Sequence, residues 1–144
     1  MSERYSLRVC TDIMLKKYID NDVYILLMKR ENTGFDDGKY ELPGGHLEAG
    51  EDIFESMIRE AKEELLIDLK KDDLKIIHIL HHYNGNRINF IFEADLNNLE
   101  PKIGEPNKCS EIRWVKINEL PDEVTDKVKL MISNIINNKF YDKL

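Results

Sequence analysis

The most constraining feature of the chain is the stretch from Gly45 to Ile67, GHLEAGEDIFESMIREAKEELLI, which runs from a glycine turn into an amphipathic helix. Asp52 is a good N-cap residue, and Glu55 lies where a capping box requires it. Apolar residues then recur at spacings of three and four, which predicts a helix with one buried stripe. The stripe consists of Phe54, Met57, Ile58, Ala61 and Leu65.

A different face of the same helix carries three carboxylates. Glu60, Glu63 and Glu64 fall together at about 100° per residue, and only Lys62 intervenes. Such like charges repel one another by roughly a few tenths of a kcal/mol per pair. A hard divalent cation such as Mg²⁺ or Mn²⁺ removes this repulsion because it prefers carboxylate oxygens. A solvent-exposed acidic face is the alternative interpretation of the pattern taken by itself.

The stretch resembles the signature of the Nudix hydrolases, G-x5-E-x7-R-E-U-x-E-E-x-G-U, in which U is a bulky aliphatic residue. The matching positions are Gly45, Glu51, Arg59, Glu60, Glu63, Glu64 and Ile67, with Ala61 at the first aliphatic position. Leu66 stands where the family has its second glycine, which ends the helix in a left-handed conformation. That conformation costs a non-glycine residue roughly 1 kcal/mol, so we expect the helix to end differently here and to run to Asp68.

The resemblance implies roles for these residues. Glu60, Glu63 and Glu64 take the metal-ligand positions, and the glycine pair abuts the metal site, where a backbone carbonyl of Gly44 completes the coordination shell beside Gly45. The resemblance implies catalysis by these three glutamates together with Arg59 and Glu105.

Two further positions match residues that orient the helix and its carboxylates. Arg59 and Glu51 are assigned this supporting role, with Arg59 as a direct phosphate clamp as the alternative. The group that takes the proton of the attacking water differs among members, and it can come from the signature or from a late loop. Glu105 and Glu111 are the late candidates. We favour Glu105 because its loop is flanked by Gly and Pro.

The rest of the chain predicts strands around two helices. Alternation or continuous apolar runs predict strands at 5–15, 23–28, 74–83, 87–95 and 110–115, with a polar turn at 16–22 and a hairpin turn at 84–86. Pro121 and Asp122 are expected to open a final helix. We therefore expect one domain over residues 1–144, an α/β/α sandwich with a mixed β-sheet between helices, which agrees with the Nudix fold.

Several residues outside the signature are candidates for substrate binding. The turn-rich segment Glu31–Lys39 precedes the signature and is predicted to border a substrate pocket, although an ordinary surface turn is the alternative. Arg8 and Arg30 are candidate substrate-binding cations. Tyr40 and Tyr83 are candidate aromatic contacts, with packing as the alternative for both.

Two further motifs, LPGGH and E-P-x-K-C-x-E-x-x-W, are similar to those of MutT-like members, which implies hydrolysis of a nucleoside triphosphate to a monophosphate and pyrophosphate. The segment after Pro121 lacks the Asn that accompanies selection of oxidised guanine. The region of Tyr83 lacks the Pro typical of ADP-ribose members and only weakly matches the Tyr of diadenosine polyphosphate members. ADP-ribose, dinucleoside polyphosphates and a non-catalytic nucleotide-binding role remain alternatives.

The net charge and the cysteine content limit which binding partners and which cellular compartment fit this chain. A net charge of −7 argues against a broad nucleic-acid-binding face but not against a nucleotide reached through metal ions. No apolar run approaches membrane-spanning length, and the first residues lack the apolar core of a signal peptide. Two cysteines fit a reducing cytoplasm. We expect a cytoplasmic monomer or homodimer that acts on a small nucleotide, without nucleic-acid or membrane partners.

Overall fold

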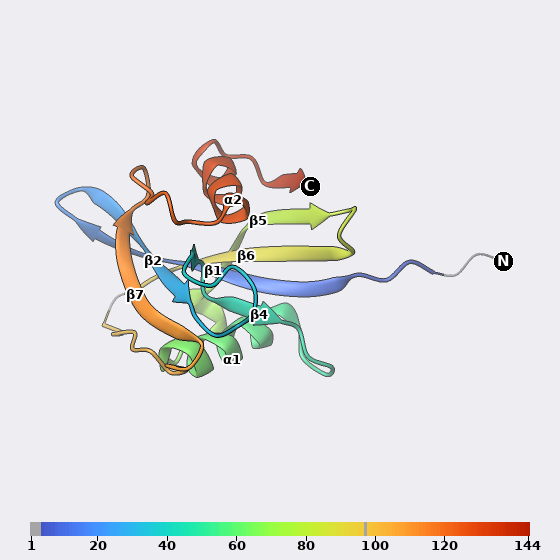
Figure 1. Ribbon diagram of the computed structural model, residues 1–144, viewed down its shortest axis with the longest axis horizontal. Coiled ribbons are helices and arrows are strands. Elements are labelled where there is room, and N and C mark those ends of the chain that lie inside the picture. The colour runs from blue at the N-terminus through green and yellow to red at the C-terminus, as the bar shows by residue number, and fades with distance from the viewer. Residues whose placement is uncertain (1–3, 97) are drawn as a thin grey trace.

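A computed structural model describes residues 4–96 and 98–144 and places a mixed sheet between two helices (Figure 1). The strands are β1 (Arg8–Ile19), β2 (Asp22–Arg30), β3 (Tyr40–Glu41), β4 (Gly44–His46), β5 (Lys75–His82), β6 (Arg87–Asp95), β7 (Cys109–Lys116) and β8 (Tyr141–Lys143). The helices are α1 (Ile53–Leu65) and α2 (Asp126–Ile136), with a short 3-10 turn η1 (Lys71–Asp73). Helix α1 covers one face of the sheet and α2 the other, which confirms the predicted α/β/α architecture.

The sheet divides along β1, and this division positions the site. Its main path runs β3-β2-β1-β6-β5-β8, with β4 paired to β1 and β7 paired to β2. The first half of β1 pairs with β4 at residues 10–12, whereas its second half pairs with β2 from Lys16 onward. On its other side β1 runs parallel to β6. The start of α1 and the glycine pair of β4 are therefore held beside the middle of β1.

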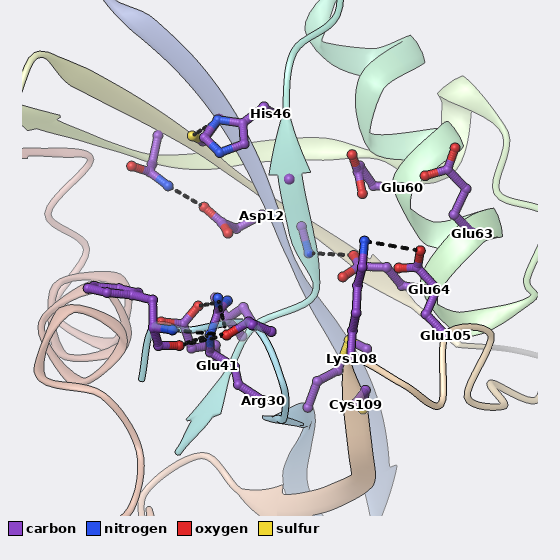
Figure 2. Close-up of a pocket in the computed structure, with 18 of the residues that line it drawn as sticks. Asp12, Arg30, Glu41, His46, Glu60, Glu63, Glu64, Glu105, Lys108 and Cys109 are labelled. Carbon is purple, nitrogen blue, oxygen red and sulfur yellow. Dashed lines mark hydrogen bonds and ion pairs between the residues drawn. The ribbon is translucent and has the colours of Figure 1, made fainter. Parts of the chain in front are cut away.

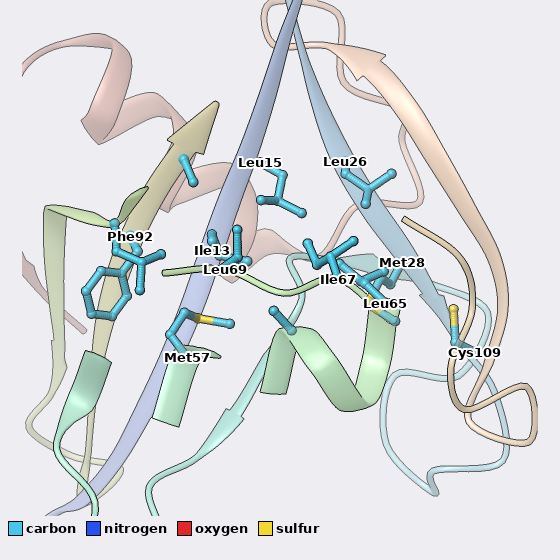
Figure 3. Packing of buried hydrophobic residues seen from close by; sticks show 13 residues of the cluster. Ile13, Leu15, Leu26, Met28, Met57, Leu65, Ile67, Leu69, Phe92 and Cys109 are labelled. Carbon is cyan, nitrogen blue, oxygen red and sulfur yellow. The ribbon is translucent and has the colours of Figure 1, made fainter. Parts of the chain in front are cut away.

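Each helix packs over its own hydrophobic core, one on each face of the sheet. The α1 side buries Met57, Ala61 and Leu65 against β1, β2 and β6 (Figure 3). On the α2 side, Val128, Met131 and Ile132 pack on the opposite face. Strand residues Ile25 to Met28 are all buried, as expected for a strand covered on both faces.

The predicted end of α1 was wrong. The helix stops at Leu65, and Leu66 adopts the left-handed conformation with φ 55° that the glycine would have supplied. This turn reverses the chain and buries Ile67 and Leu69, which are 2% and 5% exposed. Burying two such side chains contributes about 1.5–3 kcal/mol each, which exceeds the roughly 1–2 kcal/mol cost of a left-handed leucine.

Two other boundaries differ from the sequence expectation. The predicted turn at 16–22 is mostly strand, because β1 continues to Ile19 and reverses through Asp20 and Asn21 with φ of 51° and 69°. The final helix begins at Asp126 with Thr125 as N-cap, not at Pro121. Residues 121–124 instead form a turn that is closed by a hydrogen bond from the Val124 amide to the Pro121 carbonyl oxygen, and backbone hydrogen bonds between Tyr40 and residues 123 and 125 hold this segment beside β3. Strands β3, β4 and β8 were not predicted.

Candidate active site

The signature carboxylates line one cavity of about 810 Å³. Glu60, Glu63 and Glu64 reach it from α1, and Glu105 reaches it from the loop before β7 (Figure 2). Local sequence produces this arrangement. The capping box of Asp52 and Glu55 forms as predicted and fixes where α1 begins, so the apolar stripe faces the core and the glutamates face the cavity.

The two glycines of strand β4, Gly44 and Gly45, lie against these glutamates and have no side chains of their own. A Cβ built on Gly45 would lie 2.3 Å from Glu60 Oε1, so only glycine allows the carboxylate its present place. The Gly44 amide donates a hydrogen bond to Glu64 Oε1 at 2.9 Å. The glycine pair therefore determines where the carboxylates of Glu60 and Glu64 lie.

Replacing Gly45 by Ala is expected to displace the Glu60 carboxylate and lower kcat/KM about a hundredfold, with little loss of stability because the contact is with the end of a flexible side chain. Steady-state kinetics and thermal melting measure the two effects. Gly85→Ala is the matched control, since its nearest neighbour is His82 Cβ at 3.3 Å in a hairpin away from the cavity. Wild-type kinetics for Gly45→Ala would contradict the assigned position of Glu60.

Arg59 joins the carboxylates of the site into one network. Its guanidinium donates two hydrogen bonds to Glu51, at 3.0 and 2.8 Å, and one to Glu60 at 2.9 Å. It also donates to Glu63 at 3.3 Å and to the carbonyl oxygen of His46 at 3.1 Å. The bidentate hydrogen bonds from Arg59 lower the pKa of Glu51 to about 2. All donors face protein oxygens, which fits a supporting role better than a phosphate clamp.

Glu64 is the most confined of the carboxylates. Burial raises its pKa to about 9, the nearby charge of Glu60 adds to this, and the Gly44 amide opposes it. Burial also raises the pKa of Glu60, with a further contribution from Glu63 and an opposing one from Arg59. Without a cation the surroundings therefore disfavour full ionisation of these carboxylates.

The loop before β7 is hydrogen-bonded to the C-terminal end of α1, and this contact brings Glu105 to the site. Gly104 donates its amide to the carbonyl oxygen of Glu64 at 2.8 Å, and Lys102 donates to that of Leu65 at 2.9 Å. A Cβ on Gly104 would meet the backbone of Glu63 at 2.1 Å, so this close approach requires glycine. Glu105 lines the cavity as a result.

Glu111, the other late candidate for the base, points elsewhere. It accepts a hydrogen bond of 2.6 Å from the Tyr40 hydroxyl and does not line the cavity. The structure therefore separates the two late glutamates and leaves Glu105 as the one near the signature.

Of the remaining residues that the sequence suggested for substrate binding, some line the cavity and others do not. Arg30 lines the cavity and donates to the Phe35 carbonyl oxygen, so the segment 31–39 does border the pocket. Arg8 lines a smaller adjoining hollow with His46. Tyr40 is 5% exposed and packs in the α2-side core, and Tyr83 lies in the β5–β6 hairpin, so neither lines the cavity. The expectation that these tyrosines contact the substrate is not supported by their positions.

A second group of polar residues lines the cavity on the other side of β4, and sequence reasoning missed it. Asp12 from β1, Arg87 and Asn89 from β6, and Lys127 from α2 meet there. Burial raises the pKa of Asp12 to about 6, against the opposing effects of Lys127 and Asn89. The available sequence signal was a carboxylate within the otherwise apolar alternation of CTDIML.

Comparison with known proteins decides the family. A family model described as NUDIX domain matches residues 17–134. The chain belongs to the Nudix family. A curated relative, the ADP-ribose pyrophosphatase of Methanocaldococcus jannaschii, is 32% identical over 90% of this chain and 83% of its own length.

Solved Nudix structures share the fold. A MutT Nudix hydrolase from Burkholderia pseudomallei has a TM-score of 0.73 and 24% identity over 89% of this chain and 97% of its own. The Nudix domain of Shewanella oneidensis NrtR, solved with ADP ribose, has a TM-score of 0.73 and 17% identity over 94% of this chain and 89% of its own. This chain is therefore a Nudix hydrolase, and it shares its fold with these solved structures.

Nudix hydrolases generally need a divalent metal ion, and the residues of this site fit one. Within residues 4–96 and 98–144 no three His, Cys, Asp or Glu side chains converge as a metal cluster, because Glu60 and Glu63 turn toward Arg59 and Glu64 toward Gly44. The donor set is nevertheless all oxygen, and a hard cation would stabilise the ionised form of these crowded, partly buried carboxylates.

In the part that the structure describes, neither helix combines the length and the apolar character needed to cross a bilayer.

Proposed function

We propose that this enzyme hydrolyses a phosphoanhydride bond in a nucleoside diphosphate derivative, using Mg²⁺ or Mn²⁺ held by Glu60, Glu63, Glu64 and the carbonyl of Gly44. The observation that carries the proposal is the meeting of these glutamates with Glu105 in one cavity beside β4. A bound divalent cation supplies charge neutralisation for the phosphates and makes a coordinated water more acidic.

The chain's own residues account for the other requirements of the reaction. Glu105 accepts the proton of the attacking water, since it lines the cavity and its only ion-pair partner among the described residues is Lys108 at 3.8 Å. Arg59 and Glu51 hold Glu60 and Glu63 in place, as positioning residues, through the contacts described above. Arg30 and Arg8 are the proposed substrate-binding cations, of which Arg30 reaches the main cavity.

Two substrates are the leading candidates. The MutT-like motifs favour a nucleoside triphosphate, cleaved to a monophosphate and pyrophosphate. ADP-ribose is the second candidate, favoured by the 32% identity to the ADP-ribose pyrophosphatase of Methanocaldococcus jannaschii. Dinucleoside polyphosphates are a further alternative.

Product analysis over a substrate panel tests this proposal. Purified protein is incubated with Mg²⁺ or Mn²⁺ and nucleoside triphosphates, oxidised nucleoside triphosphates, ADP-ribose, diadenosine tetraphosphate or nucleotide sugars. Monophosphate plus pyrophosphate identifies the first candidate, and AMP plus ribose 5-phosphate identifies the second. Tight nucleotide binding without any hydrolysis would instead support a non-catalytic binding role.

Metal binding is expected to stabilise the protein. At a Mg²⁺ or Mn²⁺ concentration about a hundredfold above Kd, the melting temperature should rise by about 8 °C. The shift should grow with pH. The raised pKa of Glu64, about 9, makes the metal-free fold retain a proton that the unfolded chain loses near its ordinary value of 4.5. Metal-free stability therefore falls as pH rises through that interval, whereas the metal-bound fold holds Glu64 ionised.

Differential scanning fluorimetry at pH 6 and pH 9, with the metal or with a chelator, measures this effect. A metal shift that is absent, or that shrinks toward pH 9, would contradict the assignment of Glu64 as a ligand.

The setting proposed for the enzyme is the cytoplasm, as a monomer or homodimer that acts on small nucleotides and not on nucleic acids. Cys10 and Cys109 are both buried and free, as is usual in a reducing compartment. The net charge of −7 disfavours a polyanion partner.

A further inference from the structure

The cavity has a second half, on the side of β4 away from the α1 glutamates. Figure 2 shows Asp12 and His46 on one side of this strand and the three glutamates on the other. Between the halves lie the two glycines of β4, since a Cβ on Gly44 would lie 2.7 Å from Asp12 Oδ1 and one on Gly45 would meet the Glu60 carboxylate. A ligand in this cavity can therefore contact both halves. The residues that line the second half are Cys10, Asp12, His46, Arg87, Asn89 and Lys127.

Three cations from three elements meet at this second half. Arg8 of β1 and Arg87 of β6 are direct register partners in the parallel strand pair, so their side chains lie side by side on one face of the sheet. Lys127 of α2 lines the cavity with Arg87, and Arg8 lines an adjoining hollow that shares His46 with the cavity. Burial lowers the pKa of His46, and the charges of all three cations lower it further, as expected if they surround one imidazole.

None of the three cations is neutralised by a protein partner. Within residues 4–96 and 98–144, none of them forms an ion pair or donates a side-chain hydrogen bond. Asp12 is the one carboxylate among the residues that line this half, and it accepts the Asn89 side-chain amide at 2.7 Å instead. Glu41, which also lines the cavity, is paired with Arg30 at 3.4 Å. In a chain of net charge −7, this half of the cavity is therefore locally positive.

An anion would compensate this arrangement. Like charges at directly paired positions of neighbouring strands repel each other, as Arg8 and Arg87 do here. Arg87 and Lys127 are half-buried, so solvent screens their charges incompletely. A phosphate group carries the opposite charge, and its oxygens accept hydrogen bonds from guanidinium and ammonium groups. A neutral sugar or base offers no such compensation.

We propose that Arg8, Arg87 and Lys127 form a second phosphate site that determines substrate selectivity by binding a phosphate group beyond the diphosphate that is cleaved. This inference rests on the proposed function. The additional phosphate is either on the leaving group, as in a nucleoside triphosphate, or on the nucleoside, as in ADP-ribose 2′-phosphate.

Selectivity ratios test the site. We would measure kcat/KM for ATP, ADP-ribose and ADP-ribose 2′-phosphate with the wild type, Arg87→Gln and Lys127→Gln, and the inhibition constant of any compound that is not cleaved. If the additional phosphate lies on the leaving group, both variants lower the ratio of ATP to ADP-ribose about tenfold. If it lies on the nucleoside, both variants instead lower the ratio of ADP-ribose 2′-phosphate to ADP-ribose about tenfold.

The control is Lys129→Gln, which removes the same charge from the same helix. The Lys129 ammonium donates to the Asp122 carbonyl oxygen at 3.2 Å, and Lys129 is not among the described residues that line the cavity, so both ratios should stay unchanged. If one of the two test variants does not fold, the other carries the same test.

Two results would overturn the phosphate site alone. One is unchanged ratios in folded, active Arg87→Gln and Lys127→Gln enzymes. The other is an equal fall of the ratio in Lys129→Gln, which would show a general effect of net charge. A wild type that hydrolyses none of the panel overturns the proposed function, and the phosphate site with it.

Discussion

Replacing Glu64 by Gln is expected to lower kcat/KM about a thousandfold while the fold stays intact. Gln has nearly the same shape, and its carbonyl oxygen can still accept the hydrogen bond of 2.9 Å from the Gly44 amide. The change removes the charge that a divalent cation needs, at the most confined of the three carboxylates. Folding should not suffer, because a neutral side chain is better tolerated in this buried position than an ionised one.

Steady-state kinetics on the best substrate of the panel, together with far-ultraviolet circular dichroism and thermal melting without metal, measure these effects. Glu119→Gln serves as the control, since this glutamate is exposed and does not line the cavity. A Glu64→Gln enzyme with activity close to that of the wild type would exclude Glu64 as a metal ligand.

The second large effect is expected from Arg59→Met. Methionine preserves helix propensity and much of the apolar volume but leaves Glu51 and Glu60 without their shared cation. Both carboxylate side chains are only 13% exposed, so their mutual repulsion is poorly screened by solvent. We expect the melting temperature to fall by about 5 °C and kcat/KM to fall about a hundredfold.

Arg59→Lys separates geometry from charge. A lysine cannot reproduce the two parallel hydrogen bonds to Glu51, so it should recover part of the stability and little of the activity. Lys62→Met is the control on the same helix, because Lys62 is 57% exposed and its one ion-pair partner among the residues that the structure describes is Asp68. Activity retained in Arg59→Met would show that the network does not position the catalytic glutamates.

Local sequence predicted the part of the site that lies on one helix. The spacing of Glu60, Glu63 and Glu64 fixes their common face once α1 begins at its cap, and the structure places them in one cavity. Glu105 was favoured from the Gly-Pro character of its loop, and the structure places it in that cavity as well. The reason for its position, the contact of Gly104 with the end of α1, is not visible in the sequence.

Tertiary contacts decided what the sequence could not. Leu66 takes a strained turn because burial of the residues that follow outweighs the strain. Tyr40 looked available for a ligand beside the glycine pair, but it pairs with Val124 in the segment before α2 and is buried in the α2-side core. Asp12, Asn89 and Lys127 come from three elements far apart in the chain, so no local pattern connects them.

The central claim is that the α1 glutamates support metal-dependent phosphoanhydride hydrolysis. The most direct test is turnover of one nucleotide substrate by the wild-type protein in the presence of Mg²⁺, then with excess chelator, then with Mg²⁺ restored. We expect hydrolysis between the phosphates that stops with the chelator and resumes with the metal. Continued hydrolysis in the chelator, or no hydrolysis of any panel substrate despite tight nucleotide binding, would contradict it.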